Sequence, residues 1–224
     1  MDKQVQMSET FRIGALLAVV GGWLDAYTYV CRGHVFANAQ TGNMVLLGIN
    51  LAQGNLRGAL YYLTPVIAFF LGIIVAEMTR LKFRGGAAIH WRQLILALET
   101  LVLAAVAFFP QGKADMEANV LVSFVSSLQV DSFRKMNGNN FVTTMCTGNL
   151  RSATEQLCSF RITGDRGALR RSLQYYGILA FFIAGAAAGV LAADAFSAYS
   201  VLLACIGLAA AFLLMLEKPP AAGR

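Results

Sequence analysis

Apolar stretches of about 20 residues recur along the chain, and each is long enough to cross the ~30 Å hydrocarbon core of a bilayer. The first begins near Phe11 and runs to Cys31. Charged residues make up only 13% of the 224 residues, whereas soluble globular domains carry about 25%. The sequence therefore predicts an all-α integral membrane protein.

One polar interruption of these apolar stretches occurs twice. Residues 25–43 read DAYTYVCRGHVFANAQTGN and residues 131–149 read DSFRKMNGNNFVTTMCTGN, at a constant offset of 106 residues. Both copies begin with an acid at the end of an apolar run, pass through a polar break and close on Thr-Gly-Asn. Interrupted apolar segments at matching places in two halves are the best sequence indication of a transporter site.

The apolar segments that follow the two Thr-Gly-Asn triplets are short, about 41–52 and 147–160. At ~1.5 Å per residue, a helix of that length covers roughly half a bilayer. Non-helical backbone survives at membrane depth only where it is buried in protein or lines a wet cavity. We therefore expect two re-entrant half-helices, capped by Asn43 and Asn149.

The distribution of Lys and Arg predicts how the two halves are oriented. Loops 80–92 and 161–171 are basic and should lie in the cytoplasm, while loop 111–117 and the loop at 194 carry little positive charge and should lie outside. With the N-terminus inside, this pattern requires both short segments to be re-entrant. The rival topology, eight full crossings with parallel repeats, places the basic loop 80–92 outside.

The preferred fold is a polytopic membrane protein built of two inverted repeats. Each repeat has three transmembrane helices plus one re-entrant half-helix, at about 11–110 and about 117–216, within a single membrane domain 1–224. Both termini are expected in the cytoplasm. The six expected full spans are 11–31, 60–77, 93–110, 118–131, 172–193 and 196–216.

The duplicated segments supply the candidate substrate-binding residues. These are Asp25, Thr41, Asn43, Asp131, Thr147 and Asn149. An intramembrane carboxylate costs about 2.5–3.5 kcal/mol on insertion scales, so such a group is first read as functional, either as a proton carrier or as a cation ligand. The positive ends of two facing half-helices would suit an anionic or a neutral polar solute, or a file of water.

Plainer interpretations stand beside these. In the first, Asp131 forms a simple ion pair with Arg134 or Lys135, which lie within one turn of it. In the second, the Thr-Gly-Asn triplets only cap two buried helices and bind nothing. Glu99 lies inside an apolar span, where we expect it to hydrogen-bond Thr100 or a neighbouring helix.

Pairs of small residues on the apolar helices indicate close helix packing. Gly185 and Gly189 form a G-x-x-x-G pair, and Gly72 with Ala76 is its counterpart in the first half. The pairs fit contacts between the two halves or between two chains.

The motifs GGWLDAYTYVCRGHVFANAQTGN, VDSF and CTGN resemble the YoaK family of bacterial inner-membrane proteins, a domain of unknown function (1275). The resemblance covers roughly residues 10–215. It implies a polytopic protein of this size in the bacterial inner membrane, and it implies no substrate or catalytic residue. The second copy has Cys146 where the first has Gln40, so the two triplets are not strictly equivalent.

The sequence thus favours a secondary transporter or channel for a small solute, with a site at mid-membrane. The alternative is a membrane sensor or assembly partner that transports nothing. No motif for a nucleophile, a nucleotide or a dinucleotide is recognised, so we expect no enzyme activity, no cofactor and no metal. The expected partners are the lipid bilayer and an unidentified small-molecule or ion solute, not nucleic acid, and a homo-oligomer is left open.

Overall fold

The computed structural model describes residues 7–82, 91–136, 139–140 and 144–216, and these form an all-helical protein apart from one two-residue ladder. The elements are η1 Met7–Glu9, α1 Phe11–Cys31, α2 Gln40–Ala52, α3 Leu56–Lys82, α4 Trp91–Val106, α5 Asp115–Ser132, β1 Lys135–Met136, β2 Asn139–Asn140, α6 Cys146–Thr163, α7 Arg166–Phe196, η2 Ser197–Ser200 and α8 Val201–Leu214.

Three stretches of the described chain are long and apolar enough to cross a membrane: Phe11–Cys31, Leu56–Lys82 and Arg166–Leu214. The third joins α7 and α8 through η2. These helices support the predicted membrane location. The predicted all-α class is confirmed.

Two of the predicted boundaries are close to those observed. Helix α1 spans the expected residues, and α2 begins one residue before Thr41. Helix α6 corrects the prediction, because its 18 residues exceed the expected segment 147–160 and correspond to about 27 Å of helix. Its second half continues because it packs on α7, where Ser172 Oγ donates to Ala153 O at 2.8 Å and Arg171 Nε to Gln156 Oε1 at 2.8 Å.

Helices α3 and α7 start earlier than their apolar stretches because of the turns that precede them. Gly54 and Gly164 adopt φ of 70° and 72°, a left-handed conformation that glycine adopts without steric strain. An Asn or Asp follows each glycine and accepts amide protons of the new helix, Asn55 from Gly58 at 3.1 Å and Asp165 from Gly167 at 2.8 Å. The Gly167 bond also lowers the pKa of the exposed Asp165 carboxyl.

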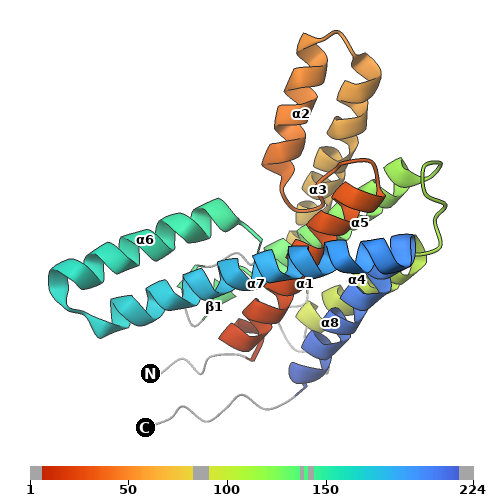
Figure 1. Cartoon of the computed structure of the whole chain (residues 1–224). Helices are drawn as coiled ribbons and strands as arrows, with labels where there is room; N and C mark the ends of the chain where they lie inside the picture. Colours follow the sequence, from red (N-terminus) through yellow and green to blue (C-terminus); the bar gives the residue numbers. More distant parts are fainter. Residues whose placement is uncertain (1–6, 83–90, 137–138, 141–143, 217–224) are drawn as a thin grey trace.

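The molecule has a central group of helices from which two helical hairpins project (Figure 1). Apolar side chains of α1, α4, α5 and α8 form the main core. Helix α2 packs along the first part of α3, and α6 along the first part of α7. These two hairpins extend away from the core in different directions (Figure 1).

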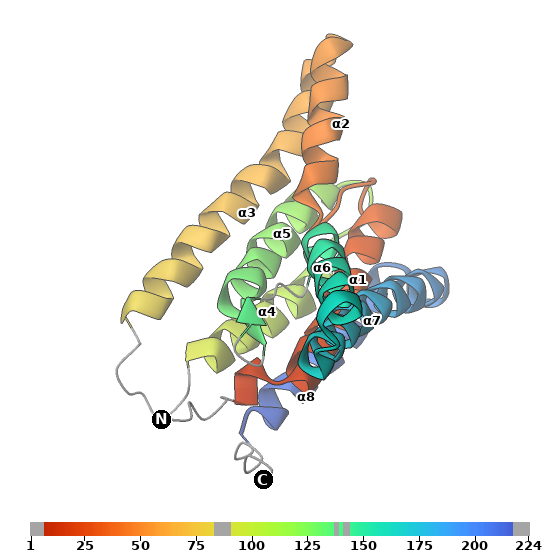
Figure 2. The same ribbon diagram turned by 90° about the vertical axis from the view of Figure 1, so that its left-hand side faces the viewer.

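The pairs of helices that pack together follow a twofold pattern. Helix α1 packs on α7 as α5 packs on α3, α1 on α8 as α5 on α4, and α2 on α3 as α6 on α7, while α4 packs on α8. The set is unchanged when each helix of the first half is exchanged for its counterpart in the second. Figure 2 shows α3 beside α5 and α6 beside α7. Helix α3 of the first half therefore covers α5, and helix α7 of the second half covers α1.

The first helices of the two halves run antiparallel. Arg32, which follows the end of α1, pairs with Asp115 at the start of α5 at 3.3 Å. Near the other end, Gln129 of α5 lies 3.3 Å from the carbonyl oxygen of Leu17 in α1. These two helices thus point in opposite directions.

Small residues permit the close approach of helices from different halves. A Cβ atom on Gly22 would clash with the Phe182 carbonyl of α7, and one on Gly185 would clash with the Val19 carbonyl of α1. A Cβ atom on Gly72 of α3 would clash with Ser127 of α5 in the same way. The small-residue pairs therefore mediate contacts between the halves, as one of the two sequence interpretations holds.

Because Gly22 meets backbone rather than a movable side chain, Gly22→Ala should push α1 away from α7 and destabilise the fold by about 1–3 kcal/mol. The measurement is the thermal unfolding midpoint in detergent. Gly48→Ala is the matched control, since no atom lies within 4 Å of its added methyl group and alanine is the better helix former. Equal midpoints for the two variants would contradict the packing argument.

Candidate functional site

The first copy of the duplicated segment folds around the carboxylate of Asp25. Its Oδ1 atom accepts the backbone N–H of Asn38 at 2.6 Å and that of Ala39 at 3.4 Å. Asp25 is only 6% exposed. The buried acid thus anchors the loop that leads into α2 and supplies acceptors for amides that lipid leaves unsatisfied.

Asn43 closes the same loop through its side-chain amide. Its Oδ1 accepts from Phe36 N at 3.0 Å, and its Nδ2 donates to Phe36 O at 2.7 Å and to Gln40 Oε1 at 2.9 Å. The prediction that Asn43 and Asn149 are helix caps is wrong, because the N-cap positions are Ala39 and Met145. Both helices begin before Thr-Gly-Asn, so each asparagine lies inside the first turn.

The second copy uses its acid differently. Asp131 Oδ1 pairs with Arg134 at 3.4 Å, and Arg134 also pairs with Glu77 of α3 at 3.2 Å. The other oxygen of Asp131 is buried and has no hydrogen-bond partner among the described residues. Asp131 thus forms the ion pair of the plainer interpretation, and the two acids do not occupy equivalent surroundings.

The other predicted residues divide by exposure. Thr41 and Thr147 are exposed on the first turns of α2 and α6, whereas Asn149 is buried. Asp25 and Asn43 join through the loop between them, while Asp131 lies in the last turn of α5, beside Arg134. Residues 137–138 and 141–143 of the predicted second break lie outside the described residues.

The two breaks nevertheless reach the same point of α1. Asn38 Nδ2 donates to the carbonyl oxygen of Gly21 at 3.2 Å, and the Thr144 side chain lies so close to Gly21 that a Cβ atom there would clash with it. Asn38 and Thr144 are counterparts at the 106-residue offset. Gly21 is the midpoint of α1, so the segments that open α2 and α6 converge halfway along this helix.

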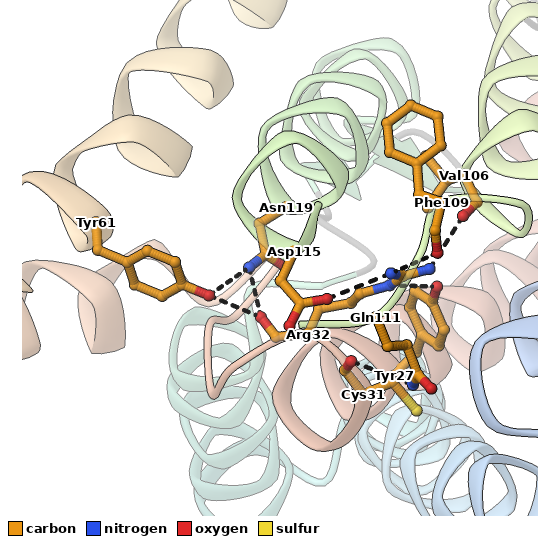
Figure 3. A network of polar contacts seen from close by, with 9 residues as sticks. All are labelled: Tyr27, Cys31, Arg32, Tyr61, Val106, Phe109, Gln111, Asp115 and Asn119. Atoms are coloured by element: carbon orange, nitrogen blue, oxygen red, sulfur yellow. Dashed lines mark hydrogen bonds and ion pairs between the residues drawn. The ribbon is translucent and has the colours of Figure 1, made fainter. Parts of the chain in front are cut away.

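The sequence did not indicate the buried network at the end of α1 (Figure 3). The Arg32 guanidinium is fully buried and donates to Tyr27 Oη at 2.9 Å, Val106 O at 3.0 Å, Phe109 O at 3.0 Å and Asp115 Oδ1 at 3.3 Å. Val106 is the last residue of α4, where the helix dipole favours a cation, and Phe109 follows it in the next loop. One arginine thereby joins the ends of α1 and α4 to the start of α5.

The backbone of the same residue extends the network to α3. The Arg32 carbonyl accepts from Asn119 Nδ2 at 2.6 Å and from Tyr61 Oη at 3.0 Å (Figure 3). Asp115 and Asn119 are four residues apart, which is one turn of α5. This spacing was the sequence signal that the two side chains lie on the same face of the helix. The network fixes the end of α1 from which the loop to α2 departs.

A second buried arginine lies at the opposite end of the helix group. Arg92, the second residue of α4, donates through Nε to Ser132 O at 2.8 Å and through Nη2 to Glu9 Oε1 at 3.2 Å. Its guanidinium lies over the rings of Trp91 and Phe133. Arg92 therefore ties the start of α4 to the end of α5 and to η1.

Comparisons with known proteins extend over most of the chain. The model of a family described as "Protein of unknown function (DUF1275)" matches residues 13–214. The UPF0700 transmembrane protein YoaK of Bacillus subtilis (strain 168) is 28% identical over 149 residues, which cover 64% of this chain and 65% of that protein. The chain thus aligns with somewhat less than two thirds of this relative's length. No solved structure matches the chain significantly.

Asp25→Ala should destabilise the protein by about 1–3 kcal/mol, because it leaves buried loop amides without an acceptor. Asp25→Asn should stay close to the wild type, because the amide oxygen still accepts from Asn38. Thermal unfolding in detergent measures both. Asp194→Ala, at an exposed position, is the control. If Asn and Ala were equally damaging, the anchoring role would be wrong.

Arg32→Met should destabilise the fold by about 3–5 kcal/mol, because it leaves Asp115 and the buried carbonyls without their cation. Arg32→Lys should not restore stability, since an ammonium group cannot reproduce the planar fork that meets four acceptors. The yield of monodisperse protein after extraction and the unfolding midpoint measure the effect. Arg166→Met, on an exposed residue, is the matched control, and full stability of Arg32→Lys would contradict the argument.

Proposed function

The chain belongs to the DUF1275 family of membrane proteins, and on that premise we propose that it is a secondary transporter or channel for a small polar solute. Its path runs where the segments opening α2 and α6 meet α1. The observation that carries the proposal is the convergence of Asn38 and Thr144 on Gly21. Interrupted helices that meet at mid-membrane are typical of solute sites.

The topology that belongs to this proposal is two inverted repeats of three spans and one re-entrant helix each. Three features support it: the duplicated sequence, the twofold pattern of helix packing and the antiparallel course of α1 and α5. Parallel repeats would require α1 and α5 to run in the same direction. The polar α6 then enters from the side opposite to α2.

The orientation follows from charge. Arg80, Arg92 and Arg134 lie at the same end of the helix group as η1, and basic residues mark the cytoplasmic side. The ring of Tyr199 in η2 makes an edge-to-face contact with Phe108 just past α4, so α8 runs back toward that basic end. In this proposal the protein lies in the bacterial inner membrane with both termini in the cytoplasm.

The solute class follows from the ends of the two helices. The first turns of α2 and α6 carry the exposed side chains of Thr41 and Thr147, and Asn149 lies buried beside Thr147. Helix N-termini favour an anion or a polar neutral molecule. Asp25 lies behind the loop before α2 and holds that loop in place. No chemical step is assigned to it.

A second candidate is a membrane sensor or assembly partner that transports nothing. It is favoured by the fact that Asp25 and Asn43 already bond their own loop and that Asp131 pairs with Arg134. In that case the duplicated segments only stabilise two interrupted helices.

Cysteine labelling with an impermeant anionic methanethiosulfonate decides between these functions. The four native cysteines are first replaced by alanine, and the reagent is added from either side of sealed membranes. Gln53→Cys and Thr163→Cys, at the tips of the two hairpins, should react from opposite sides. Thr41→Cys and Thr147→Cys should react because water reaches them, while Leu71→Cys, exposed on the apolar face of α3, should be silent.

Each outcome has one meaning. Reaction of both hairpin tips from the same side would refute the inverted repeats. Silence of Thr41→Cys and Thr147→Cys, with the tips reacting, would refute a water-filled path and favour the sensor.

A further inference from the structure

A carboxylic acid lies in the middle of α4 without any exposed surface. Glu99 is fully buried, and no Lys, Arg or His of the described chain forms an ion pair with it. Its expected partner Thr100 instead donates to Leu96 O at 2.7 Å. Such a group in a membrane helix is a candidate functional site.

The side chain that faces Glu99 is Gln129 of α5, and its amide fits in two orientations. In one, the amide oxygen faces the carboxyl group and the nitrogen lies 3.3 Å from Leu17 O of α1. In the other, the nitrogen lies 3.0 Å and 3.2 Å from the two Glu99 oxygens. The first suits a protonated acid that donates a hydrogen bond, and the second suits a carboxylate that accepts two. One amide can therefore satisfy Glu99 in both protonation states.

The other elements packed on α4 add few titratable groups. Helix α8 presents Cys205, whose Sγ lies 3.7 Å from Thr100 O. Helix α3 carries Glu77, which pairs with Arg80 and with Arg134 at the end of the helix group. Glu99 thus has no cation to hold it ionised among the described residues.

A stripe of buried polar side chains passes this acid along α5. It consists of Asn119, Ser123, Ser126, Gln129 and Ser132, which recur every three or four residues and so follow a helical line. Four of its atoms have no hydrogen-bond partner among the described residues: Asn119 Oδ1 and the hydroxyls of Ser123, Ser126 and Ser132. Buried hydroxyls are nearly always bonded to protein or water, so this line suits water molecules between the side chains.

The stripe reaches both ends of the helix group. Asn119 donates to the Arg32 carbonyl at 2.6 Å, and the Ser132 carbonyl accepts from Arg92 at 2.8 Å. Gln129 and Glu99 lie between these ends. The polar line therefore extends along most of α5, and Glu99 lies beside it at Gln129.

We propose that Glu99 is a proton-binding site of the membrane core and that protons reach it along the Ser123–Ser126 stripe of α5. The inference rests on the proposed transport function and names its coupling ion. In this scheme the Glu99 carboxylate takes up H⁺ delivered through the hydroxyl line, the Gln129 amide turns, and loss of the same H⁺ restores the carboxylate. A metal cation fits less well, because hard cations need several oxygen ligands and this place offers one carboxyl and one amide.

The test uses the purified full chain in sealed vesicles that contain a pH-sensitive dye, with a potassium gradient and valinomycin setting the potential. Wild-type vesicles should acidify faster than protein-free vesicles. Glu99→Gln should lose this flux entirely, and the Ser123→Ala/Ser126→Ala double variant should reduce it. Glu117→Gln, which alters an exposed acid outside the stripe, should keep the wild-type rate.

Infrared difference spectra between acidic and alkaline pH give a second readout that needs no flux. The absorption of buried protonated carboxyl groups should be as large in Glu117→Gln as in the wild type and smaller in Glu99→Gln, in which the buried Asp25 and Asp131 remain. The proposal is overturned if Glu99→Gln leaves this absorption unchanged, if that variant conducts protons at the wild-type rate, or if wild-type vesicles leak no faster than protein-free ones. If Thr41→Cys and Thr147→Cys are still labelled in those cases, the transport function stands and only the proton site falls.

Discussion

Peptide groups that leave a helix inside hydrocarbon must find partners within the protein, and this constraint governs the structure around α1. The loop before α2 meets it with side chains instead of secondary structure. Asp25 accepts two loop amides, while Asn43 bonds both the N–H and the C=O of Phe36. The acid and the asparagine that mark the duplicated segment are thus first of all the means by which an interrupted helix is tolerated. Any solute site must be built on top of that role.

Helix α1 is the element on which the other parts depend. It packs on α7 and α8, receives the loop before α2 and the segment before α6 at Gly21, and ends in the Arg32 network. Glycines on α1 and on α7 let the two backbones touch. Such close packing stabilises helix contacts in a membrane, where the hydrophobic effect between helices is weak. At its far end a single guanidinium replaces the water that the α4 carbonyls would otherwise bind. The stability of the helix group is therefore concentrated in few contacts, each on a different neighbour of α1.

The sequence predicted the features that depend on local pattern. The bounds of α1 and the start of α2 followed from apolar length and from the Thr-Gly-Asn triplet. The extents of α3, α6 and α7 did not, because polar residues continue these helices beyond their apolar parts. The Arg32 network was missed since four of its partners, Val106, Phe109, Asp115 and Asn119, lie 74 to 87 residues away. The pattern did indicate Arg134 as a partner of Asp131, but it did not show that the backbone of Asn38 faces Asp25.

The exchange of long helices between the halves also bears on how such a chain arose. A single repeat would leave the glycine face of its first helix uncovered, and its own third helix packs elsewhere. On the proposed topology, only a second copy inserted upside down could cover that face. The ancestor of this fold would then have been a dual-topology homodimer, and the loop that now joins α4 to α5 would be the genetic fusion that fixed one orientation for each half.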